Sequence, residues 1–119
     1  MKILLADDSQ FMRTILKSML GKVFPDAEFT EVGTGTLAIS AWQEQRPDLL
    51  LLDLVMPEKG GIDVLKEIGS SKTGAIIVIS ALGQEKIIEE ATSLGANAFI
   101  VKPFDEKKVI ETVKTTLKL

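Results

Sequence analysis

The side chains best able to do chemistry in this sequence come directly after short apolar runs. In chain order, these side chains are Asp7, Asp8, Asp53, Ser80 and Lys102. The apolar runs before them are residues 3–6, 49–52, 75–79 and 98–101. A carboxylate next to so apolar a run is costly unless a cation or a hydrogen-bond donor pairs with it. We therefore predict that these side chains meet in one polar site, with Asp53 at its centre.

Three carboxylates that converge repel one another, and a divalent cation held by oxygen atoms relieves that repulsion. Mg²⁺ is the natural candidate because it accepts a few carboxylates and keeps several waters. With an amine and backbone N–H groups, such an ion would form a receptor for a phosphoryl group. The sequence has no Cys and no His, which excludes disulfides, thiolate or imidazole catalysis and Cys/His zinc sites. The nucleophile that remains is a carboxylate, which can form an acyl phosphate.

Alternating strands and helices are predicted to position these residues. The predicted strands are residues 3–6, 28–32, 49–53, 75–79 and 98–101, and 28–32 is partly polar, as is typical of an edge strand. Apolar residues at helical spacing predict helices across residues 11–23, 37–42, 62–68, 87–94 and about 105–117. Asp8 or Ser9 is expected to cap the first helix. This order predicts an α/β fold with a parallel sheet covered on both faces, whose ligands bind at the carboxyl ends of the strands.

Length and composition limit the remaining possibilities. A chain of 119 residues predicts one domain, residues 1–119, with a core of its own. The net charge of -3 argues against a general binder of nucleic acids or anionic membranes. No apolar run approaches the ~20 residues of a membrane helix, and Lys2 is followed by only a short apolar run before the acids. We therefore expect a cytoplasmic protein with no signal peptide and no membrane insertion.

The motifs at the strand ends resemble those of response-regulator receiver domains. The resemblance covers the whole chain and rests on the motifs Asp7-Asp8-Ser9, Asp53 with Met56-Pro57, Ser80-Ala81 and Lys102-Pro103-Phe104. The run from Asp8 to Arg13 resembles the stand-alone chemotaxis (CheY-like) type. The family implies a doubly wound, flavodoxin-like sheet of five parallel strands in the order 2-1-3-4-5, with five helices. That strand order is carried over from the family and is not worked out from the sequence.

The resemblance also implies roles for the acids and for the metal. Asp53 would be the phosphoacceptor. Asp8, Asp53 and the backbone carbonyl of Val55 would bind Mg²⁺ directly, and Asp7 would act mainly through water.

Further roles implied by the family concern the phosphoryl group and the switch. Lys102, the Ser80 hydroxyl and the Ala81 N–H group would bind phosphoryl oxygens. Ser80 and Phe99 would form the switch, and the Lys102–Pro103 bond is often cis in this family.

The partners follow from the same resemblance and from the absence of His. The phosphoryl donor would be another molecule, either the phosphohistidine of a sensor histidine kinase or a small acyl phosphate. The chain would be no ordinary enzyme, because it would catalyse only its own Mg²⁺-dependent phosphorylation and dephosphorylation. With no sequence after the last helix to bind DNA, we expect a monomer whose output is contact with a downstream protein, such as a motor-switch protein.

The sequence departs from the family pattern at two places. The family commonly has Asp before the helix that follows the phosphoacceptor loop, and here that position is Gly60, followed by Gly61. Glycine caps a helix only slightly less well than Asp, and the paired glycines predict a more mobile loop. The switch aromatic is Phe99 in place of Tyr, so it has no hydroxyl for any switch step that needs one.

Three alternatives remain open at this point. Gly33–Ala38 matches G-x-G-x-x-A, with Asp53 20 residues beyond Gly33, as in a dinucleotide fingerprint. That motif follows the polar edge strand, however, so a helix-start turn is the better interpretation. A carboxylate-nucleophile phosphatase would typically need a second acid at Val55 and a cap insertion. A receiver that serves only as an interaction module would not need the intact acids and Lys102, and Mg²⁺ titration would decide.

Overall fold

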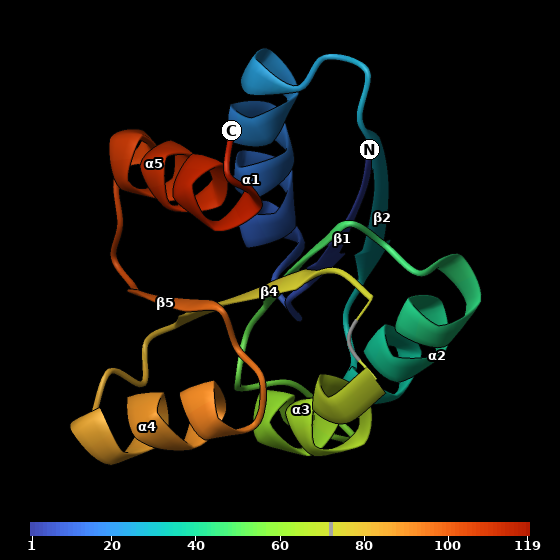
Figure 1. The fold of residues 1–119 in the computed structure, drawn as a ribbon, viewed down its shortest axis with the longest axis vertical. Helices are drawn as coiled ribbons and strands as arrows, with labels where there is room; N and C mark the ends of the chain where they lie inside the picture. The colour runs from blue at the N-terminus through green and yellow to red at the C-terminus, as the bar shows by residue number, and fades with distance from the viewer. Residues whose placement is uncertain (72) are drawn as a thin grey trace.

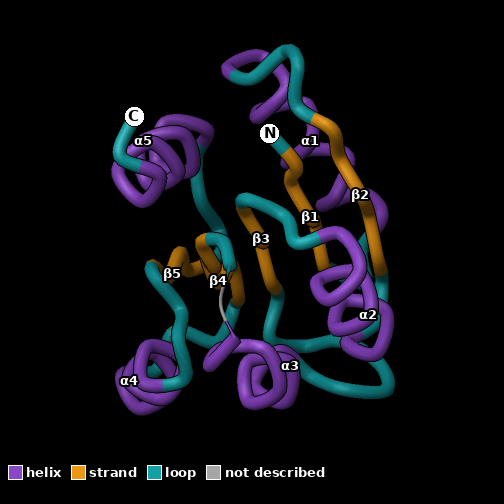
Figure 2. The backbone as a smooth tube through the Cα atoms, turned by 45° about the vertical axis from the view of Figure 1, so that its right-hand side comes forward, coloured by secondary structure: helices purple, strands orange, loops and turns teal. Residues whose placement is uncertain are grey.

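The apolar runs of the sequence form the strands of one parallel sheet. The computed structural model describes residues 1–71 and 73–119. The strands are β1 (Lys2–Ala6), β2 (Glu28–Val32), β3 (Leu49–Leu52), β4 (Ala75–Ser80) and β5 (Ala98–Val101). They pair in parallel in the order β2-β1-β3-β4-β5, and Figure 2 shows β1, β2 and β3 side by side. The predicted strand order is therefore confirmed, and the strand boundaries agree to within one residue.

Two layers of helices cover the two faces of this sheet (Figure 1). The helices are α1 (Gln10–Val23), α2 (Gly35–Gln45), α3 (Gly61–Ile68), α4 (Glu85–Ser93) and α5 (Glu106–Leu117), with a 3-10 turn, η1 (Gly69–Ser71), after α3. Helices α1 and α5 pack on one face, and α2, α3 and α4 pack on the other. This arrangement confirms the doubly wound fold. No helix in the described part of the chain is long and apolar enough to cross a membrane.

The leucine run lies in the middle of the sheet. β3 pairs with β1 on one side and with β4 on the other. Leu50 and Leu52 belong to the core under α2, α3 and α4, whereas Leu49 and Leu51 belong to the core under α1 and α5. Each fully buried leucine contributes about 1.5–3 kcal/mol, so the packing holds this strand firmly. Asp53 is the next residue, and its place at the carboxyl end of the sheet follows directly.

The exposed faces of two helices differ from the simplest sequence pattern. In α1, apolar residues recur every four positions at Phe11, Ile15, Met19 and Val23. Phe11 is nevertheless 75% exposed, and the buried residues of α1 are Leu16 and Leu20. A helix has 3.6 residues per turn, so a strict four-residue series drifts around its surface and its ends cannot share one face. In α2, the apolar side chain of Leu37 would be expected to pack against the sheet, but it is exposed, and Ile39 is buried instead.

Candidate functional site

The carboxyl ends of three strands bring the central charges of the site together. Asp7 follows β1, Asp53 follows β3 and Lys102 follows β5. The Lys102 ammonium Nζ lies 3.0 Å from Asp7 Oδ2 and 3.0 Å from Asp53 Oδ2. These partners lie 95 and 49 residues from Lys102 in the sequence. The fold thus provides the cation that the buried carboxylates require.

The third acid, Asp8, lies on the solvent-exposed side of the two buried acids. Asp7 is 3% exposed and Asp53 is 7% exposed, whereas Asp8 is exposed. One carboxylate oxygen from each acid lies within 4.8 Å of the other two. Three oxygens at this spacing, with no nitrogen or sulfur donor, suit a hard cation that keeps part of its water shell. The described residues therefore fit Mg²⁺.

Local hydrogen bonds fix the direction of the two buried carboxylates. The Ser9 N–H group donates to Asp7 Oδ1 at 2.9 Å, and the Val55 N–H group donates to Asp53 Oδ1 at 3.2 Å. In each carboxylate, one oxygen thus holds the turn after its strand, and the other oxygen faces Lys102. The acids are oriented by the backbone before any ligand arrives.

The electrostatic environment keeps Lys102 charged. Burial of its ammonium lowers the pKa, but the hydrogen bonds to Asp7 and Asp53 and the charges of these acids raise it. The net result is a pKa above the ordinary value of 10.5, so the side chain is protonated at neutral pH. The Lys102–Pro103 peptide bond is cis, as the family resemblance implies.

The hydroxyl expected at the site belongs to the neighbouring strand. Ser80 ends β4 and is fully buried, and its Oγ accepts a hydrogen bond from the Leu82 N–H group at 3.2 Å. Among the described residues it makes no hydrogen bond to the acids. Ala81 is exposed at the start of the next loop. Phe99 lies on β5, half-buried against the core under α2, α3 and α4.

The glycines after Asp53 allow close packing. A Cβ atom at Gly61 would lie 2.5 Å from the Asp53 carbonyl oxygen and 2.7 Å from the Leu54 Cα atom, closer than real Cβ atoms come. Gly60 caps α3 without a side-chain hydrogen bond. The left-handed residue of this loop is Glu58, with φ 68°, and not a glycine. Gly61 is thus required by the close approach of α3 to the backbone of the loop after β3.

The Gly-x-Gly motif starts a helix, as the sequence analysis favoured. The Thr34 side chain caps α2 by accepting a hydrogen bond from the Leu37 N–H group. A Cβ atom at Gly35 would lie 1.9 Å from the Lys59 carbonyl oxygen, so this glycine lets α2 rest on the loop after Asp53. The motif follows β2, which is an edge strand. A dinucleotide-binding turn would follow the first strand at the switch point of the sheet, so this alternative loses its support.

Arg13 is a residue of the site whose role the sequence pattern did not predict. Arg13, in the first turn of α1, donates a hydrogen bond from Nη1 to the Asp7 carbonyl oxygen at 2.6 Å. Its Nε donates to Glu31 Oε1 on β2 at 3.2 Å. The structure confirms Ser9 as the N-cap of α1. The sequence feature that could have indicated Arg13 is a positively charged side chain one helical turn after this cap.

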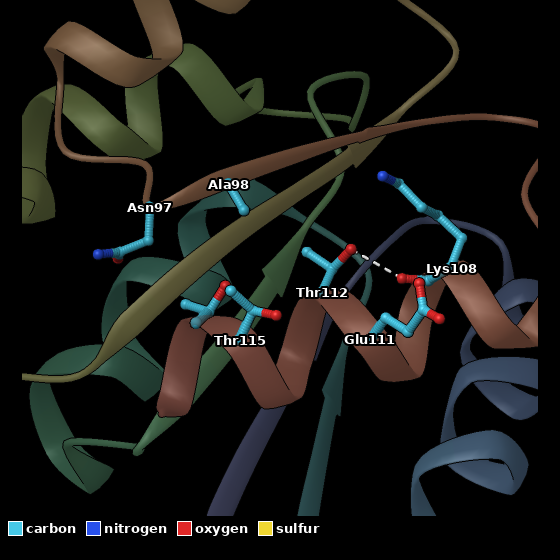
Figure 3. Close-up of a pocket in the computed structure, with 7 residues that line it drawn as sticks. Asn97, Ala98, Lys108, Glu111, Thr112 and Thr115 are labelled. Atoms are coloured by element: carbon cyan, nitrogen blue, oxygen red, sulfur yellow. Dashed lines mark hydrogen bonds between the residues drawn. The ribbon is translucent and has the colours of Figure 1, made fainter. Parts of the chain in front are cut away.

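Two surface hollows lie near β5, at its opposite ends. A largely apolar groove of about 500 Å³ adjoins Lys102; its lining is Met12, Ile15, Met19, Ala81, Lys102, Pro103 and Phe104. A second hollow, of about 490 Å³, lies between α5 and the start of β5 (Figure 3). There the Thr112 hydroxyl donates a hydrogen bond to the Lys108 carbonyl oxygen, one turn earlier in α5. This second hollow contains none of the clustered acids, so the chemistry belongs at the other end of the strand.

Comparisons with known proteins agree with this geometry. The response regulator receiver domain family matches residues 3–114. The chemotaxis protein CheY of Thermotoga maritima is 39% identical over 118 residues, which cover 98% of each chain. CheY of Bacillus subtilis is 40% identical over 121 residues, covering 98% of this chain and 97% of that protein. The response regulator domain of Thermotoga maritima CheB superposes with a TM-score of 0.86 at 29% identity, covering 100% of this chain and 97% of that one. The chain belongs to the response regulator receiver domain family.

Proposed function

We propose that this chain is a phosphorylation-controlled signalling receiver that accepts a phosphoryl group on Asp53 in a Mg²⁺-dependent reaction. The donor is the phosphohistidine of a sensor kinase, and the output is a change of protein–protein contacts in the control of chemotaxis. The observation that supports this proposal best is the Lys102 ammonium, which bridges the buried carboxylates of Asp7 and Asp53 beside the exposed Asp8. The similarity to CheY proteins supports the chemotactic role.

The reaction uses Asp53 as the nucleophile. A carboxylate oxygen of Asp53 attacks the phosphorus of the donor's phosphoimidazole, an O–P bond forms, and the N–P bond breaks. The leaving imidazole keeps the electron pair of that bond and takes up a proton. Asp8, Asp53 and the Val55 carbonyl would hold Mg²⁺, with Asp7 acting through water, and the bound ion would neutralise charge on the phosphoryl oxygens.

The other polar residues bind the oxygens of the transferred group. Lys102 already lies 3.0 Å from the Asp53 carboxylate, so its ammonium can pair with a phosphoryl oxygen attached there. The Ser80 hydroxyl, at the end of β4, and the Ala81 N–H group, in the loop that follows, supply further donors. Beside them, the apolar groove next to Lys102 offers a surface for the protein that carries the phosphohistidine.

The proposal is tested by mass spectrometry of the intact protein. Incubation with a small acyl phosphate and Mg²⁺ should add one phosphoryl group, because the proposed reaction has one nucleophile, Asp53. Omission of Mg²⁺, or its removal with a chelator, should abolish the adduct. A protein that binds Mg²⁺ but gains no phosphoryl group would be an interaction module instead.

Phe99 is expected to transmit the phosphorylated state. A phosphoryl group on Asp53 would draw the Ser80 hydroxyl away from the Leu82 N–H group, and the Phe99 ring would turn into the space that this loop leaves. The ring is already half-buried, so only part of the free energy of burying an aromatic remains to be gained. A remaining gain of about 1 kcal/mol corresponds to a roughly fivefold shift between the two states. Without a hydroxyl, Phe99 must supply this bias by apolar burial alone.

This role predicts a specific effect of the Phe99→Ala substitution. In wild-type protein, beryllofluoride with Mg²⁺ should mimic the phosphoryl group and shift the backbone NMR signals of both the site and α4. In Phe99→Ala the signals of the site should still shift, whereas those of α4 should respond much less. Phe29→Ala, at a half-buried ring on the edge strand β2, is the matched control and should behave like wild type. A full response of α4 in Phe99→Ala would show that Phe99 is only a packing residue.

A further inference from the structure

Arg13 links three elements at the acid-bearing turn after β1. Its side chain is 17% exposed, and it lies in the first turn of α1. Nη1 donates to the Asp7 carbonyl oxygen at 2.6 Å, and Nε donates to Glu31 on β2 at 3.2 Å. The guanidinium has a rigid planar shape, so these two bonds together fix the position of Asp7 relative to the edge strand.

The bond to the Asp7 carbonyl oxygen acts on Asp8. That carbonyl belongs to the planar peptide that joins Asp7 to Asp8, so holding it fixes the N–Cα bond of Asp8 and restricts the directions in which the Asp8 side chain can leave the backbone. The Asp7 N–H group is bonded to the Val32 carbonyl oxygen at 3.1 Å, on the other side of Asp7. Within the described residues the Asp8 carboxylate has no hydrogen-bond partner. Its orientation therefore depends on its backbone.

We infer that Arg13 is a positioning residue that holds Asp8 in place to bind Mg²⁺. This inference rests on the proposed function, in which Asp8 is a direct ligand of the metal. Arg13 touches neither the phosphoryl group nor the cation in this role. It acts through the peptide between Asp7 and Asp8, and Glu31 orients its guanidinium.

A purely electrostatic role of Arg13 predicts the opposite result. Arg13 carries a positive charge near three carboxylates that would attract Mg²⁺. If only this charge mattered, its removal would leave the site more negative, and Mg²⁺ would bind more tightly. If Arg13 positions Asp8, its removal frees the peptide, and Mg²⁺ binds more weakly. The sign of the change in affinity therefore separates the two roles.

The test is calorimetric titration of Mg²⁺ into the full chain, without any phosphoryl donor. Arg13→Met removes both hydrogen bonds and the charge but keeps a long side chain. It should raise the dissociation constant about tenfold, at the lower end of the range for outer-shell partners of metal ligands. Arg13→Lys keeps the charge and one donor group and should recover part of the loss. Lys17→Gln is the control, because Lys17 pairs with Glu31 at 3.8 Å and lies over the Phe29 ring, and among the described residues it makes no ion pair with the three acids. This variant should leave the affinity within twofold of wild type.

The outcomes distinguish this inference from the proposed function. A wild-type chain that binds no Mg²⁺ would refute the metal site itself. If wild type binds Mg²⁺, and Arg13→Met binds it equally or more tightly, the positioning role is wrong. Melting temperatures without metal serve as the structural readout. If Arg13 only stabilised the fold, its replacement would lower the melting temperature without changing the affinity for Mg²⁺. Should Arg13→Met not fold, Arg13→Lys decides, since wild-type affinity in that variant would overturn the inference.

Discussion

Replacing Asp53 by Asn should abolish the phosphoryl adduct completely. Asn has nearly the same shape, and its amide oxygen can still accept the hydrogen bond from the Val55 N–H group. The amide, however, lacks the negative charge and the nucleophilic oxygen that an acyl phosphate requires. We therefore expect a folded protein that gains no mass from a small acyl phosphate and Mg²⁺.

The matched control for this result is Asp63→Asn. Asp63 is an exposed acid in the first turn of α3, and it forms no ion pair with the described residues. Its replacement should leave one adduct per chain. An adduct that persists in Asp53→Asn would place the phosphoryl group on another residue. Peptide mapping of the phosphorylated wild-type chain gives an independent check of the position.

Replacing Asp8 by Ala should weaken Mg²⁺ binding more than replacing Asp7 does. Asp8 is exposed at the open side of the cluster, whereas Asp7 is buried and already bonded to Ser9 and Lys102. The loss of a direct ligand should exceed the roughly 10–100-fold loss typical of an outer-shell partner. Calorimetric titration with Mg²⁺ measures both variants directly.

Without metal, the order of the two variants should be reversed: Asp7→Ala should lower the stability of the fold more than Asp8→Ala does. Asp7→Ala removes one carboxylate partner of Lys102 and opens a buried space, so the free energy of unfolding should fall. Asp8→Ala removes a repelling charge that has no described hydrogen-bond partner, so the chain should keep its stability or gain some. Equal changes of both affinity and stability in the two variants would contradict the assigned roles.

Most of the fold could be predicted from the sequence because its strands are so apolar. The run Leu49–Leu52 can be buried on both faces only in the middle of a covered sheet, and that placed Asp53 at the carboxyl end. The strand order was implied by the family resemblance, and the structure confirms it. The neighbourhood of the acids and Lys102 followed from the geometry of parallel sheets.

The features that were missed depend on contacts between distant segments. Arg13 meets Glu31 on β2 and the carbonyl of Asp7, and no local pattern shows which carbonyl a guanidinium will reach. Gly61 was interpreted as a source of freedom, but its real constraint is the approach of α3 to the Asp53 backbone. Phe11 shows that an apolar series at four-residue spacing does not by itself determine the buried face.

The position of Lys102 after an edge strand has a consequence for the way the molecule opens. Among the described strands β5 pairs with β4 alone, whereas β1 and β3, which precede the acids, each pair on both sides. Edge elements separate from a native protein at lower free energy than central strands do. The cation can therefore detach in partial unfolding events that leave the acid-bearing strands paired. A phosphoryl group that Lys102 holds would oppose this separation, so phosphorylation would slow hydrogen exchange in β5 and α5 before it affects the middle of the sheet.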